Sequence, residues 1–145
     1  MSKSIYLDYA AATPVRKEVL AEMKPYFSKQ FANPSSIHKF GEEAGLAVAT
    51  ARNKIARILD CDNSEIVFTS CGSESINLAI QGIARAKGKG HIITSRAEHA
   101  ATLRCSEWLE GQGFQVTYLD PSSTGLISAS QVESAIQENT ILVSL

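Results

Sequence analysis

Hydrophobic and polar positions follow two different periods along the chain, and the change of period predicts two different halves. In the first half, apolar residues recur every three or four positions, which is the spacing of one helix face. This spacing predicts a helix over residues 16–30, interrupted near Pro25, and a longer helix over residues 42–60. The opening IYLDYAAATP predicts a short extended start, and the NPS sequence at 33–35 predicts a turn between the two helices.

In the second half, short apolar and β-branched runs replace the helical spacing. EIVFTS, HIITS, FQVTYL and TILVSL each predict a strand. Helices are expected between them over residues 74–86 and 100–110, and Ser130 with Glu133 three residues later predicts the start of a last helix. Strands that alternate with helices favour parallel pairing through right-handed crossovers. The pattern therefore predicts a helical arm followed by an α/β sheet layered with helices.

Composition and charge argue against several kinds of protein. The 145 residues are 44% hydrophobic and 20% charged with a formal net charge of −1, which is typical of a globular domain. The basic residues are scattered, which argues against direct nucleic-acid binding. No apolar stretch resembles a membrane span or a signal peptide, so we expect a soluble, cytoplasmic protein without membrane contact. Cys61, Cys71 and Cys105 contain no C-x-x-C pair, which argues against a disulfide framework and a zinc site.

One polar segment, TSCGSESINLAI at residues 69–80, lies between a predicted strand and a predicted helix. Ligands of open α/β sheets bind outside the carboxyl ends of strands, where a helix amino terminus offers unpaired N–H groups and a positive dipole end. Gly72 allows close approach, and Ser73 and Ser75 add hydroxyl donors, so the segment suits a phosphate. The alternative is that Ser73 only caps the helix, and taken alone the segment favours capping. It matches neither the dinucleotide fingerprint nor the P-loop.

A second polar segment, TSRAEHA at residues 94–100, also follows a predicted strand and precedes a predicted helix. Glu98 and His99 are therefore expected at the same edge of the sheet as Ser73. A flat imidazole beside a phosphate site indicates a planar, phosphorylated cofactor. The alternative, a surface histidine at a helix start, is about equally supported by the two segments together.

Six segments together resemble the cysteine desulfurases, which belong to the class V, fold-type I pyridoxal-phosphate enzymes. They are YLDYAAATPV, FANPSSIHKFG, EIVFTSCGSESINLAI, HIITSRAEHAA, GFQVTYL and TILVSL, in the family's order and spacing over essentially the whole chain. The resemblance implies βαβαβαβ units from the large domain of a fold-type I transferase, forming an incomplete three-layer α/β/α sheet. It divides the chain into an extended segment (1–15), a helical arm (16–60) and a truncated major domain (61–145).

The resemblance also implies a cofactor site for pyridoxal 5'-phosphate (PLP). Gly72 and Ser73 match the family's phosphate loop, T-S-G-[GA]-T-E-[SA], and are expected to hold the cofactor phosphate. His99 matches the family's E-H segment and is expected to stack on the pyridine ring and to act as a catalytic proton carrier. Glu74 and Asn77 match positions for which no ligand role is expected, and no metal ion is implied.

Three further positions carry weaker expectations from the same resemblance. Residues Asp8–Thr13 resemble the segment that edges the substrate pocket, while Asn33 and His38 fall in a motif of mixed structural and active-site use. Family members usually have glycine where this chain has Cys71. If that position required a positive φ angle, a cysteine there would be strained.

The resemblance covers only the N-terminal part of proteins that run to several hundred residues. The family's cofactor-binding lysine and nucleophilic cysteine match no residue here. Lys87 and Lys89 lie in a turn-like stretch and are poor substitutes, and Cys61 and Cys105 are expected to be small packing residues. We therefore expect the 145-residue chain to be inactive on its own.

The family reaction removes sulfur from L-cysteine and gives L-alanine and a protein-bound persulfide. The sulfur then supplies iron–sulfur cluster assembly or tRNA thiolation. The resemblance implies that full-length members are homodimers that pass sulfur to acceptor or scaffold proteins. Two alternatives stay open: a related class V enzyme, such as a selenocysteine lyase or an aminotransferase, and a non-catalytic fragment.

Overall fold

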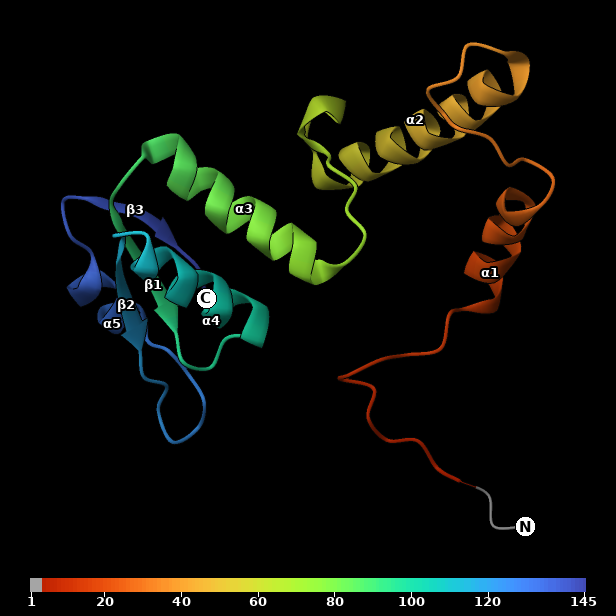
Figure 1. Ribbon diagram of the computed structural model, residues 1–145. Coiled ribbons are helices and arrows are strands. Elements are labelled where there is room, and N and C mark those ends of the chain that lie inside the picture. Colours follow the sequence, from red (N-terminus) through yellow and green to blue (C-terminus); the bar gives the residue numbers. More distant parts are fainter. Residues whose placement is uncertain (1–3) are drawn as a thin grey trace. The chain divides into compact units, whose positions relative to one another are not determined.

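The computed structural model describes residues 4–145, which divide into two compact units (Figure 1). The first unit ends at Val67, and the second comprises Phe68–Leu145. Each unit is described on its own below. The finer division at residues 15 and 60 stays a prediction.

The first unit is helical, as the apolar spacing predicts. Its elements are α1 (Lys17–Met23), the 3₁₀ turn η1 (Lys24–Phe27), α2 (Lys39–Leu59) and the 3₁₀ turn η2 (Asn63–Glu65). The α-helix stops at Met23 because Pro25 has no N–H to donate to the next turn, and a 3₁₀ turn continues the chain. The predicted interruption near Pro25 is confirmed.

Local contacts fix the start of α2. The Asn33 side chain accepts a hydrogen bond from the Ser35 N–H at 2.9 Å, which holds the predicted turn. His38 is the N-cap, and its Nδ1 accepts a hydrogen bond from the Gly41 N–H at 3.2 Å. A Cβ at Gly41 would clash with the Ser36 carbonyl, so only glycine fits. Asn33 and His38 thus have structural roles here, and their active-site use stays a prediction.

The second unit is a parallel three-stranded sheet in the order β2-β1-β3. Its strands are β1 (His91–Ser95), β2 (Gln115–Leu119) and β3 (Thr140–Val143), and its helices are α3 (Gly72–Lys87), α4 (Ala100–Gly111) and α5 (Ala129–Ala135). Three of the four predicted strands, their parallel pairing and the helices between them are confirmed.

Helices cover both faces of this sheet. The crossover through α4 runs from β1 to β2, and the crossover through α5 runs back from β2 to β3. Parallel crossovers are right-handed almost without exception, and two right-handed crossovers that run in opposite directions across a sheet lie on opposite faces. α3 packs beside α4 (Figure 1), and the two helices bury a core against β1 made of Ile80, Ala84, Ile92, Cys105 and Leu109. The predicted α/β/α layering is confirmed.

Two predictions from the sequence are wrong. EIVFTS is not a strand, because residues 66–69 have no regular structure and no described strand pairs with them. Ser130 does not cap α5; Ser128 does, since its Oγ accepts the Gln131 N–H at 3.2 Å and the Gln131 side chain accepts the Ser128 N–H at 2.9 Å. This reciprocal pair is the capping box that the sequence S-x-x-Q encodes.

Within residues 4–145, no helix combines the length and the apolar character needed to cross a membrane.

His91 joins the three strands through its ring. The side chain is 1% exposed, and its Nδ1 and Nε2 lie 2.9 Å from Thr140 Oγ1 on β3 and 2.8 Å from Thr117 Oγ1 on β2. A neutral imidazole offers one donor and one acceptor, and each hydroxyl can supply the complementary role. Burial lowers the pKa of His91 because it penalises the charged ring.

This lowered pKa predicts a loss of stability in mild acid. Below pH 6.5, the ordinary pKa of histidine, His91 is protonated in the unfolded chain but stays neutral in the folded chain. The unfolded state is therefore favoured, and the free energy of unfolding falls as the pH falls. We expect His91→Asn to be less stable than the wild type near pH 7 but to lose less further stability towards about pH 5. Urea unfolding at a series of pH values measures both. An equal acid-induced loss in the two proteins would contradict the prediction.

Candidate functional site

The polar segment at residues 69–75 forms the turn that enters α3. Cys71 is the N-cap, with an extended backbone (φ −164°, ψ 168°) that any residue adopts, so the cysteine causes no strain there. Ser73 lies inside the helix, one residue after Gly72, so the alternative that Ser73 caps α3 is wrong.

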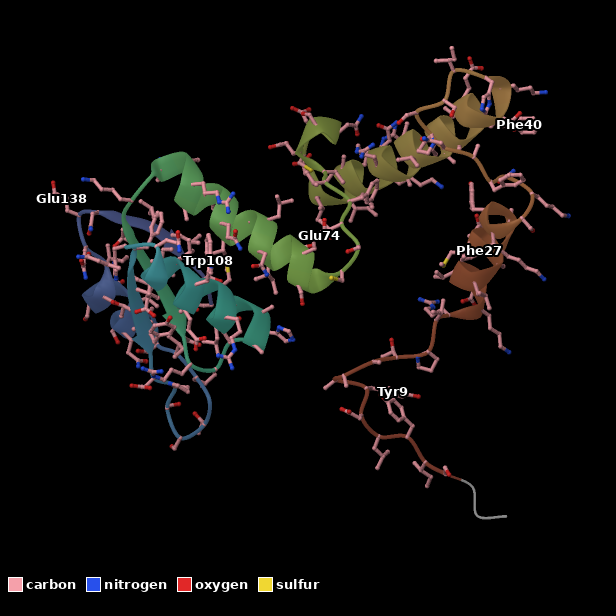
Figure 2. The ribbon with its side chains drawn as sticks, in the orientation of Figure 1. Tyr9, Phe27, Phe40, Glu74, Trp108 and Glu138 are labelled. Carbon is pink, nitrogen blue, oxygen red and sulfur yellow. The ribbon has the colours of Figure 1, made fainter. Side chains whose placement is uncertain are left out.

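Two pairs of side chains hold this turn. The Glu74 carboxylate accepts hydrogen bonds from the Ser70 N–H at 2.8 Å and the Ser70 hydroxyl at 2.5 Å (Figure 2 labels Glu74). The hydroxyls of Thr69 and Ser75 lie 2.6 Å apart. The hydrogen bonds from Ser70 lower the pKa of Glu74, so its carboxylate stays ionised and continues to accept these bonds within the turn. Apart from the short spacing between Ser70 and Glu74, nothing in the sequence indicates this role.

The described structure contains no steric or conformational reason for glycine at position 72. Its φ angle is not positive, and a Cβ built on it meets nothing within 4 Å. Neither backbone conformation nor crowding within the described structure therefore requires glycine. The open space lies beside the first turn of a helix, where N–H groups can meet an anion.

Ser73 and the first turn of α4 lie close together. The amino-terminal ends of α3 and α4 lie at the same end of the second unit (Figure 1), and Ser73 and Ala101 line one hollow of about 370 Å³ between the helices. His99 is the N-cap of α4, and its Nδ1 accepts a hydrogen bond from the Ala101 N–H at 3.1 Å. Its ring is exposed. The structure thus brings the two polar segments to one edge of the sheet, as the sequence predicts.

The donors at this edge fit a phosphorylated planar group. Open space at Gly72 admits a phosphate to the helix terminus, the Ser73 hydroxyl can donate to it, and the His99 ring offers a flat face. Across residues 4–145, no three His, Cys, Asp or Glu side chains are grouped so that they could hold a metal ion. The donor chemistry therefore favours an organic phosphate.

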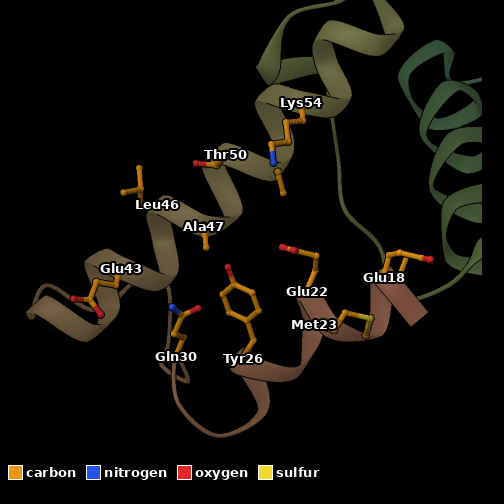
Figure 3. Close-up of a pocket in the computed structure, with 12 residues that line it drawn as sticks. Glu18, Glu22, Met23, Tyr26, Gln30, Glu43, Leu46, Ala47, Thr50 and Lys54 are labelled. Atoms are coloured by element: carbon orange, nitrogen blue, oxygen red, sulfur yellow. The ribbon is translucent and has the colours of Figure 1, made fainter. Parts of the chain in front are cut away.

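A larger hollow of about 740 Å³ lies in the first unit, between α1 with η1 and α2 (Figure 3). Its lining mixes apolar side chains such as Met23 and Leu46 with Glu22 and Lys54, and contains neither histidine nor cysteine. None of the predicted site residues lines it. This hollow and the predicted site are therefore separate features of the chain.

The three cysteines are free and lie in three different environments. Cys105 is buried in the core, which raises the pKa of its thiol and confirms its predicted packing role. Cys61 is half-buried. Cys71 is exposed, and the Glu74 N–H, followed by the Ser70 hydroxyl, lowers the pKa of its thiol.

Comparison with known proteins gives a consistent result. The model of the family described as aminotransferase class-V matches residues 5–145. Curated relatives named cysteine desulfurase IscS are 48% identical in Dictyoglomus turgidum and 50% identical in Methanosarcina thermophila, over 100% and 99% of this chain. A solved structure described as SspA in complex with cysteine is 53% identical, with a TM-score of 0.90, over 97% of this chain and 41% of that one. The chain spans 37% and 36% of the length of these two curated relatives.

The environments of the cysteines predict their order of alkylation. We expect iodoacetamide to modify Cys71 first and Cys105 last near pH 7, because the thiolate is the reacting form and Cys105 is shielded. Peptide mass spectrometry over a time course measures each rate. The urea-unfolded chain is the control, in which the three rates should converge. Equal rates at Cys71 and Cys105 in the folded chain would contradict the assigned environments.

Proposed function

The chain belongs to the class-V aminotransferase family, and we propose that it supplies the phosphate site of a PLP-dependent cysteine desulfurase. The observation that carries the proposal is the position of Gly72: it is the first residue of α3, where helix N–H groups are unpaired, and open space lies beside it. The curated relatives are named cysteine desulfurases, and one similar solved structure is a complex with cysteine, which supports L-cysteine as the substrate.

Three residues would hold the cofactor. The N–H groups at Gly72 and Ser73, with the Ser73 hydroxyl, would bind the phosphate, and the positive end of the α3 dipole would favour its charge. The His99 ring would lie against the planar part. When bound, PLP supplies an electron sink for the carbanion that forms beside the substrate amine. Glu74 carries negative charge close to this site. Its carboxylate accepts two hydrogen bonds from Ser70, which hold the side chain in the turn.

The reaction that we propose is removal of sulfur from L-cysteine to give L-alanine and a persulfide on an enzyme thiol. We further propose that the full-length protein is a cytoplasmic homodimer that delivers sulfur to acceptor or scaffold proteins for iron–sulfur clusters or tRNA thiolation. Three free thiols are compatible with a reducing compartment. The family membership supports the remainder of this proposal.

A single methyl group at Gly72 tests the phosphate site. Gly72→Ala is compatible with the fold, since the backbone is helical and the new Cβ meets nothing, but the methyl group occupies the space left for the phosphate. We expect it to weaken PLP binding several-fold in a fluorescence titration, and inorganic phosphate to compete with PLP for the wild type. Gly82→Ala is the matched control, because Gly82 lies on the same helix and is equally uncrowded. Equal affinities in the two variants would contradict the assigned site.

A chimera tests the desulfurase assignment. This chain would replace the matching segment of the D. turgidum relative, with which it is 48% identical. If the proposal is right, the chimera converts L-cysteine to L-alanine, and Ser73→Ala in the chimera raises the PLP concentration needed for activity. Amino acid analysis measures the alanine, and the intact relative is the control. A folded, PLP-loaded chimera that forms no alanine from cysteine would contradict the proposal.

A further inference from the structure

Two helical elements of this chain begin with an ordinary capping box. In α5 the Gln131 side chain accepts the N–H of the N-cap residue Ser128 at 2.9 Å, and in η2 the Glu65 side chain accepts the N–H of the N-cap residue Asp62 at 2.7 Å. In both elements the accepting side chain belongs to the third helical residue. Such a box uses up the N–H group of the N-cap residue.

In α3 the same kind of side chain makes its bonds one residue earlier. Glu74 is the third residue of α3, and its carboxylate accepts the Ser70 N–H at 2.8 Å and the Ser70 hydroxyl at 2.5 Å. Ser70 precedes the N-cap residue Cys71, so the N–H group of the N-cap is not used. These two bonds form the Ser70–Glu74 clasp, which is a capping box displaced by one residue.

The displacement leaves hydrogen-bond donors open at the start of α3. Within residues 4–145, neither the Cys71 N–H nor the Gly72 N–H meets a hydrogen-bond acceptor, and open space borders Gly72. An ordinary box would bring the Glu74 carboxylate onto the Cys71 N–H and would place a negative charge among these donors. The clasp therefore orders the turn and leaves its donors unpaired.

The direction of these donors is fixed by the residues around them. The Cys71 carbonyl accepts hydrogen bonds from the Thr69 hydroxyl at 3.2 Å and the Ser75 hydroxyl at 3.3 Å. This carbonyl and the Gly72 N–H belong to one planar peptide unit and point in opposite directions, so fixing the carbonyl fixes the N–H. The clasp holds Ser70, on the other side of Cys71, through both its N–H and its hydroxyl.

We propose that Glu74 is a positioning residue, which keeps the Cys71 and Gly72 N–H groups oriented and unpaired for the phosphate. Its contribution comes from its two hydrogen bonds to Ser70, because its negative charge by itself opposes an anion at this helix start. The positioning role rests on the function proposed above, whereas the clasp itself does not.

Two neutral substitutions separate the hydrogen bonds of Glu74 from its charge. Both bonds of the clasp end on the same oxygen, Oε2, so the single carbonyl oxygen of glutamine can accept both, whereas alanine accepts neither. In a fluorescence titration, we expect Glu74→Gln to bind PLP at least as tightly as the wild type and Glu74→Ala to bind it several-fold more weakly. Ser70→Ala removes only the hydroxyl bond and should lie between them. Equal affinities of Glu74→Gln and Glu74→Ala would refute the positioning role. Glu42→Gln and Glu42→Ala are the matched controls, because Glu42 lies in the first turn of α2.

The clasp is measured without any ligand by amide hydrogen exchange on the ¹⁵N-labelled chain. Relative to its intrinsic rate, the Ser70 amide should exchange more slowly than the Cys71 and Gly72 amides in the wild type and in Glu74→Gln, and Glu74→Ala should remove this protection. Equal protection of Ser70 in the wild type and Glu74→Ala would overturn the clasp and the positioning role together. A protected Ser70 amide in a wild-type chain that binds neither PLP nor inorganic phosphate would overturn the proposed function, and the positioning role that rests on it, while the clasp stands.

Discussion

The second unit depends on the burial of β1 between two parallel neighbours. All five of its residues are buried, with Ile92 and Ile93 1% and 0% exposed. Ile92 anchors α3 and α4 on one face of the sheet, while the His91 ring reaches β2 and β3. The carboxyl end of this strand is therefore fixed, and the polar segment that follows it starts from a rigid position.

The same packing concentrates positive potential at one edge of the sheet. α3 and α4 lie side by side with their amino-terminal ends together, so two helix dipoles present the same sign there. Two acidic side chains in these segments reduce this positive potential: Glu74 accepts the Ser70 N–H at 2.8 Å, and Glu98 accepts the His99 N–H at 3.2 Å. The predicted anion site at this edge therefore depends on the helix N–H donors and dipoles outweighing these two carboxylate charges.

Local chemistry was predictable from the sequence, and distant pairing was not. HIITS encodes β1 residue for residue, since a short β-branched run between turns has few alternatives. EIVFTS has the same local character, but a strand exists only beside a partner, and composition does not reveal one. Gly72, Ser73 and His99 stay predicted site residues, whereas the hydrogen bonds of Glu74 depend on how the turn folds and are not readable from the sequence. The S-x-x-Q pattern at Ser128 forms the capping box of α5, whereas the S-x-x-E spacing of Ser130 and Glu133 lies inside the helix.

The His91 clamp also bears on the order in which the chain can fold. Its two threonine partners lie 26 and 49 residues further along the sequence. Each contact closes a long loop, whose entropy must be lost before the contact is made. During synthesis the ring therefore lacks its second partner until Thr140 has emerged. β1 is the first strand of the sheet to be made and the last to be completed.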